Sequence, residues 1–139
     1  SKVPMRVWVV DDSGSMMAGD GQIVRNGKII KCTRAKELAE TVKAQAALAA
    51  ALGTRCDFQF LNGPCFTVDG GHSDKATVDA QLAALHGDLG PDGVTRGGTP
   101  LTESVRDVIK IIAPAAESLR AAGQRALVVL ATDGHPNNP

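Results

Sequence analysis

Runs of consecutive apolar residues at the two ends of the chain are its clearest structural signal. The first forms most of residues 5–10 and contains Val7, Trp8, Val9 and Val10, and the second is residues 126–131. An unbroken apolar run of this length is typical of a strand buried on both faces of a parallel sheet. We therefore predict two fully buried strands that lie side by side. Residues 56–61 predict a further strand, and residues 66–68 a short antiparallel strand at an edge.

Three helices are predicted between these strands. The first runs to Leu52, with Thr33 as its N-cap and Gly53 as its C′ residue. The second covers residues 75–85 and is followed by a loop over residues 87–98. The third covers residues 100–122, and we expect Pro114 to kink or split it because proline breaks the ladder of helical hydrogen bonds.

Residues 22–31 instead predict a β-hairpin, because Asn26-Gly27 is the favoured two-residue turn between two strands. This hairpin follows the end of the first strand, so we expect it to stand beside any site there. Strands that alternate with helices predict an α/β fold: a three-layer sandwich with a mostly parallel central sheet and right-handed crossovers. The 139 residues fit a single domain, residues 1–139.

Composition excludes several classes of function. The formal net charge is +0 and aromatic residues make up 3%, so neither phosphate neutralisation nor base stacking supports nucleic-acid binding. No apolar run approaches the length of a membrane span. The odd number of cysteines (Cys32, Cys56 and Cys65) favours free thiols in a reducing compartment, which slightly favours a cytoplasmic over a secreted location.

Oxygen-bearing side chains follow the two apolar strands and precede the third helix. An acid and two hydroxyls occur at alternate positions after the first strand, a threonine follows Gly97-Gly98, and an aspartate follows the second apolar strand. Ligands of open α/β sheets bind at the carboxyl ends of the strands, so these groups should meet at one solvent-facing rim. Hard oxygens suit Mg²⁺ or a similar cation. The predicted metal ligands are Asp11, Ser13, Ser15, Thr99 and Asp133.

In this order and on these elements, the five residues resemble the metal-ion-dependent adhesion site of a von Willebrand factor type A domain. The resemblance covers essentially the whole chain. It implies hydroxyl ligation by Ser13, Ser15 and Thr99, with Asp11 and Asp133 holding metal-bound waters or binding directly in some states. The cation would be Mg²⁺, with Mn²⁺ or Ca²⁺ as substitutes. Its open coordination position would capture an acidic side chain of a partner protein, so the module would bind rather than catalyse.

The sequence departs from this family in two respects. The hairpin is longer than a simple passage from the metal loop into the first helix, and we expect it to help select partners. Members of the family usually continue with two more strands and their helices, so the domain is expected to be incomplete at its C-terminal end. Val128, Val129 and Leu130 would then lie on an unpaired sheet edge. We expect that edge to meet the remainder of a larger domain, a complementing chain or a swapped oligomer.

Three alternatives remain open from the sequence. A phosphohydrolase of the haloacid dehalogenase type would use Asp11 as its nucleophile, but Ser13 stands where such enzymes need a second aspartate. A serine hydrolase would pair Ser13 or Ser15 with His135, although the Gly-x-Ser-x-Gly elbow is absent. A third alternative keeps the predicted fold and metal site but makes the protein an intracellular adaptor of a chaperone-like ATPase or chelatase.

Overall fold

The computed structural model describes residues 5–71, 73–98 and 100–132, and a four-stranded sheet lies at its centre. The strand order is β5-β4-β1-β6. β1 (Met5–Val10) pairs in parallel with β4 (Arg55–Phe60) on one side and β6 (Ala126–Ala131) on the other. β5 (Cys65–Asp69) forms the antiparallel edge beside β4. The predicted α/β class, the neighbouring apolar strands and the antiparallel edge strand are confirmed.

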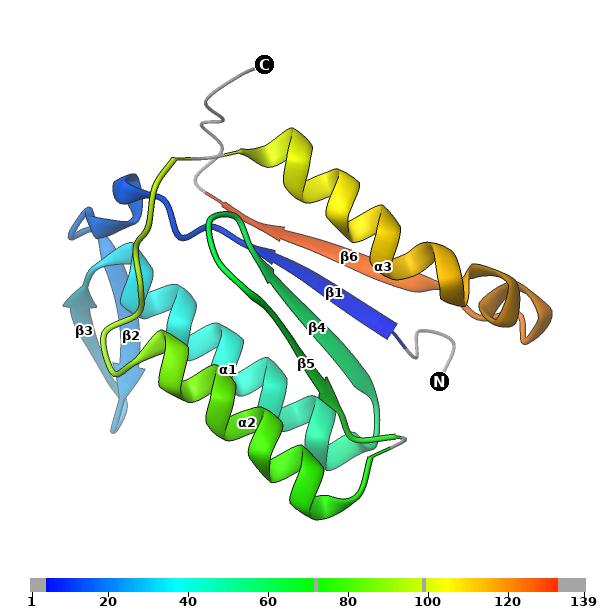
Figure 1. Ribbon diagram of the computed structural model, residues 1–139. Helices are drawn as coiled ribbons and strands as arrows, with labels where there is room; N and C mark the ends of the chain where they lie inside the picture. Colours follow the sequence, from blue (N-terminus) through cyan, green and yellow to red (C-terminus); the bar gives the residue numbers. More distant parts are fainter. Residues whose placement is uncertain (1–4, 72, 99, 133–139) are drawn as a thin grey trace.

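Helices cover both faces of this sheet, which makes three layers (Figure 1). α1 (Arg34–Leu52) and α2 (Lys75–Leu89) lie on one face, where Phe58, Phe60 and Leu85 are fully buried. α3 (Leu101–Ala121) lies on the other face, where it packs on Val7 and Val9. Alternate residues of β1 therefore enter opposite halves of the core, as the two-residue period of a strand requires.

The boundaries of α1 agree with the predicted capping residues, whereas α2 and α3 each differ from prediction in one respect. Thr33 accepts a hydrogen bond from the Lys36 amide at 3.1 Å, and Gly53 closes α1 in the left-handed region at φ 66°, both as predicted. α2 continues to Leu89 instead of ending at residue 85, because the side chain of Leu89 also enters the core. α3 continues through Pro114, so the helix is not split there.

The predicted hairpin forms a separate two-stranded sheet of β2 (Gly21–Arg25) and β3 (Lys28–Cys32), joined through Asn26 and Gly27 at positive φ. β2 packs along α1, and Arg25 pairs with Glu40 at 2.6 Å. The base of the hairpin lies near the start of α1, and its turn lies farther along that helix, away from the end of β1 (Figure 1). Only the base therefore stands beside the predicted site.

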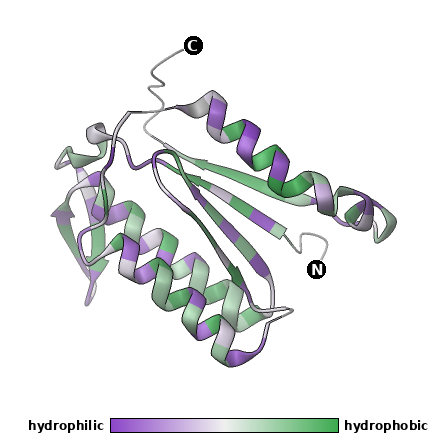
Figure 2. Cartoon of the chain, viewed as in Figure 1, coloured by the Kyte–Doolittle hydropathy of each residue, from purple (hydrophilic) through white to green (hydrophobic). Residues whose placement is uncertain are grey.

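β6 is more exposed than a strand buried on both faces. Leu127, Val128 and Leu130 are 46%, 41% and 52% exposed, so the prediction of a fully buried strand is wrong. β6 is the last strand in the sheet order, and α3 packs mainly over β1 and β4. Figure 2 shows that β6 is nonetheless hydrophobic along its length. The expectation of an apolar strand on an unpaired edge thus holds for the described residues.

Two further predictions can be compared with the described residues. Cys32, Cys56 and Cys65 are all free thiols, as expected. Among the described helices, none combines the length and the apolar character needed to cross a lipid bilayer.

Candidate metal site at the end of strand β1

Asp11 occupies the first position after β1 and joins two segments that are distant in the sequence. Its amide donates to the Ala131 carbonyl at 2.9 Å, which extends the pairing of β1 with β6. Its carboxylate accepts the Ser13 amide on Oδ1 at 2.8 Å and the Thr132 hydroxyl on Oδ2 at 2.7 Å. Asp11 was expected at a solvent-facing rim, but it is only 2% exposed and lies beneath that rim. These bonds hold the carboxylate in one orientation.

Ser13 and Ser15, which follow Asp11 in the same segment, have their hydroxyl groups within hydrogen-bond distance of each other. Their Oγ atoms lie 3.1 Å apart. Ser13 is buried at the entrance of a short 3-10 helix, η1 (Gly14–Met17), whereas Ser15 is exposed on that turn. Met16 is 6% exposed and anchors η1 in the core. Ser13 at the N-cap and Ser15 in the 3-10 turn therefore present two neighbouring hydroxyls.

The segment before the predicted threonine ligand also reaches this position. The Gly14 amide donates to the Gly97 carbonyl at 3.1 Å, so residues 11–15 and the α2–α3 connection touch directly. Thr99 and Asp133 themselves lie outside the described residues. Three of the five predicted ligands are thus brought together, and residues adjoining the other two, Gly98 and Thr132, lie at the same end of the sheet.

Asp12 has a different set of partners from Asp11. It is fully buried, and its Oδ1 accepts both the Asn62 backbone amide at 3.0 Å and the Asn62 side-chain amide at 2.9 Å. The Asn62 side chain also donates to the Gly98 carbonyl. The side-chain contacts of Asp12 therefore lie with the β4–β5 and α2–α3 connections.

Arg96 completes this second network. Its Nε donates to Asp12 Oδ2 at 2.9 Å, and its two terminal nitrogens donate to Asp88 at 3.0 and 3.1 Å. The guanidinium carbon also lies 5.2 Å from the centre of the Phe60 ring. Burial opposes the charge on Arg96, but the hydrogen bonds to Asp88 and Asp12 outweigh it and raise the pKa of the guanidinium. Arg96 is therefore a permanent cation held between two carboxylates.

Sequence reasoning missed Asn62 and Arg96. The available signal was positional: Asn62 follows β4, whose carboxyl end lies at the same edge as that of β1, and Arg96 directly precedes Gly97. Neither signal identifies a partner, because the contacts of Asp12 with these residues span 50 and 84 positions.

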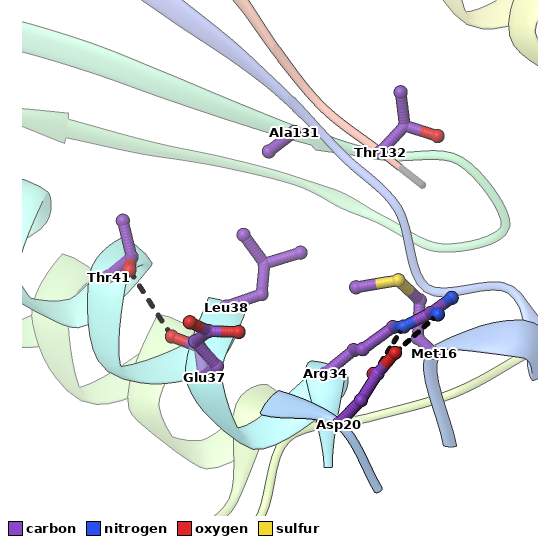
Figure 3. Close-up of a pocket in the computed structure, with 8 residues that line it drawn as sticks. All are labelled: Met16, Asp20, Arg34, Glu37, Leu38, Thr41, Ala131 and Thr132. Atoms are coloured by element: carbon purple, nitrogen blue, oxygen red, sulfur yellow. Dashed lines mark hydrogen bonds and ion pairs between the residues drawn. The ribbon is translucent and has the colours of Figure 1, made fainter. Parts of the chain in front are cut away.

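A cavity of about 520 Å³ adjoins the candidate site on the α1 face of the sheet (Figure 3). Thr132, which donates to Asp11, and Met16, which follows Ser15, are in its wall. An ion pair between Arg34 and Asp20 at 2.6 Å closes one side. The remaining lining residues are Glu37, Leu38, Thr41 and Ala131.

The described residues contain no group of three or more His, Cys, Asp or Glu side chains that could hold a metal ion. The predicted ligand set does not depend on such a group, since three of its five members are hydroxyls. Comparisons with protein-family models, with curated proteins and with solved structures returned no match to the chain.

Proposed function

We propose that this protein is a divalent-cation-dependent protein-binding module of the von Willebrand factor type A kind. The observation that carries the proposal is that the Ser13 and Ser15 hydroxyls lie side by side in the segment whose Ser13 amide binds the Asp11 carboxylate. In the proposal, Thr99 and Asp133 complete the ligand set. The cation supplies an electrophilic centre that a partner's carboxylate can join.

The spacing of the two hydroxyls fits a small hard cation. Mg²⁺ binds oxygen at about 2.0–2.1 Å in an octahedron, so adjacent ligands lie about 2.9 Å apart. The Oγ atoms of Ser13 and Ser15 are 3.1 Å apart, close to that edge length. Two side chains held at this spacing can occupy neighbouring coordination positions without a large change in the 3-10 turn.

The role of Asp11 follows from its hydrogen bonds. Both carboxylate oxygens already accept a bond within the protein, from the Ser13 amide and the Thr132 hydroxyl. This arrangement supports orientation of metal-bound water by Asp11 more than direct bonding to the cation. Serine ligands carry no charge, so the cation keeps much of its attraction for an anionic oxygen from outside. An acidic residue of a partner protein would provide that oxygen.

The same contacts argue against the phosphohydrolase alternative. An aspartate nucleophile must reach the phosphorus atom, whereas Asp11 is 2% exposed and bonded through both oxygens. The position two residues later is Ser13, which cannot serve as the carboxylic acid/base that this chemistry requires.

Calorimetric titration of Mn²⁺ and Mg²⁺ into the chain tests the proposal. Ser15→Ala should weaken binding because it removes one ligand from an exposed turn, while Ser118→Ala, an exposed serine on α3, should leave it unchanged. Adding N-acetylglutamate amide to the Mn²⁺-loaded protein should then lower water proton relaxation as its carboxylate displaces bound water. Absence of Mn²⁺ binding in the unaltered chain, or equal affinity in Ser15→Ala, would reject the proposed site.

A further inference from the structure

We infer that Asp12 and Arg96 form a latch that holds the α2–α3 connection against the end of β1 and so positions the candidate site. In this role Arg96 is a positioning residue, since its side chain is bound to Asp12 and Asp88 and not to the predicted metal ligands. The contacts of this latch are present in the protein without any bound cation. Its consequence for a bound cation rests on the proposed function.

The geometry gives the latch three attachment points. The Arg96 side chain bonds Asp12 at the end of β1 and Asp88 in the last turn of α2, and the Arg96 amide bonds the Asp12 carbonyl. The side chain and the backbone of Arg96 thus both bind Asp12 at the end of β1. The next residue, Gly97, accepts the Gly14 amide from the turn that carries Ser13 and Ser15.

Burial makes this latch costly to open. The side chains of Asp12 and Arg96 are 1% and 28% exposed, so water screens the pair poorly. Separating them would leave the Asp12 carboxylate buried with Asn62 as its remaining described partner. A buried charge without its counter-ion is strongly unfavourable. The connection and the 3-10 turn are therefore expected to keep one relative position before any ligand binds.

Two possible roles of Arg96, as a repelling charge and as a positioning residue, predict opposite changes in cation affinity when Arg96 is removed. Arg96 is positive, so its removal should strengthen binding of a nearby divalent cation if charge alone matters. If Arg96 positions the ligand loops, its removal should weaken binding, because the turn that carries Ser13 and Ser15 is then held less firmly. The loss should be smaller than the roughly 10–100-fold caused by removing a group bonded directly to a metal ligand. Arg96→Met distinguishes the two by the sign of the change.

The first experiment measures amide hydrogen exchange of Gly14 in the metal-free protein. Arg96→Met should speed this exchange about ten-fold or more, because the Gly97 acceptor is no longer held in place. Arg96→Lys should fall between it and the unaltered chain. Arg25→Met, which breaks the exposed Arg25–Glu40 pair, should change nothing. Unchanged exchange of Gly14 in Arg96→Met would overturn the latch.

Arg96→Met leaves a buried charge and can fail to fold, so the Asp12→Asn/Arg96→Met double variant is measured in parallel. It removes both charges and leaves the net charge unaltered, and it should show the same faster Gly14 exchange. Slow exchange in the folded double variant would equally overturn the latch.

The second experiment titrates Mn²⁺ into the same variants. Weaker binding in Arg96→Met and in the charge-neutral double variant supports positioning, and equal or tighter binding in either overturns it. If the unaltered chain binds no Mn²⁺, the proposed function is rejected. The latch is then tested by the hydrogen exchange of the Gly14 amide alone.

Discussion

Replacing Gly97 with alanine tests how tightly the α2–α3 connection is packed against the candidate site. Gly97 has φ +59°, and a Cβ built there would lie 2.7 Å from Asn62 Oδ1 and 2.9 Å from Asn62 Cγ. Both the backbone conformation and the space therefore require glycine. The residue also accepts the Gly14 amide, so it cannot shift without disturbing the turn that carries Ser13 and Ser15.

Two costs add in this variant. An alanine in the left-handed region costs about 1–2 kcal/mol. Displacing the Asn62 side chain weakens its hydrogen bond to the buried Asp12 carboxylate, and hydrogen bonds to charged groups are worth about 1.5–3 kcal/mol. The expected loss of unfolding free energy is roughly 2.5–5 kcal/mol, or about 9–17 °C in the melting temperature for a chain of this size.

Urea denaturation of Gly97→Ala, followed by circular dichroism, measures this loss. Gly87→Ala is the matched control, because Gly87 lies inside α2 where an added Cβ would meet nothing within 4 Å, and it should stabilise by about 0.5–1 kcal/mol. In an Asn62→Ala background the same Gly97→Ala change should cost only about 1–2 kcal/mol, because the clash is gone. A loss below about 1 kcal/mol in the unaltered background would refute the inferred packing.

Three further predictions concern other parts of the chain. Thr33→Ala should lower the unfolding free energy by about 1 kcal/mol in urea denaturation, because the Lys36 amide loses its cap, and Thr33→Ser should retain it; equal stability of the two variants would contradict this. Burial, with a smaller contribution from the charge of Asp57, raises the pKa of the Cys56 thiol to about 12 from an ordinary value of 9.0. The folded state therefore holds this proton more tightly than the unfolded state, and stability should fall as pH rises above about 9, by about 1.4 kcal/mol at pH 10. A Cys56→Ala variant should lack this part of the decline, and identical pH dependence in both chains would reject the assignment. Val7→Asp should unfold the domain because Val7 is fully buried. Val129→Asp on the edge strand β6 should remain folded, with a loss of about 2 kcal/mol by thermal melting. Unfolding of Val129→Asp would show that β6 is covered in solution.

Local features of this chain were predictable because short-range chemistry decides them. The Asn26-Gly27 turn needs two residues at positive φ, and Thr33 and Gly53 supply the caps of α1 within a few residues of their targets. The alternation of strands and helices likewise predicted the layered α/β fold. Asp11, Ser13 and Ser15 lie within five consecutive residues, so local sequence alone keeps them together.

Other features depend on partners that are far apart in the sequence. An apolar run predicts burial on both faces, but only the strand order shows that β6 is the last strand in the sheet, with half-exposed side chains. α2 ends at Leu89 and not at residue 85 as predicted, because the side chain of Leu89 packs into the core one turn farther along the helix.

By itself, then, the sequence determined the main strands and helices, the caps of α1 and the candidate ligands that follow β1, since these rest on neighbouring residues and on strand period. Only the tertiary structure decided that Asp11 is buried and that Asp12 is held by Asn62 and Arg96. The physical reason is that burial and ion pairing depend on which side chains the folded chain brings within a few ångströms, and the partners of Asp12 come from segments 50 and 84 positions away.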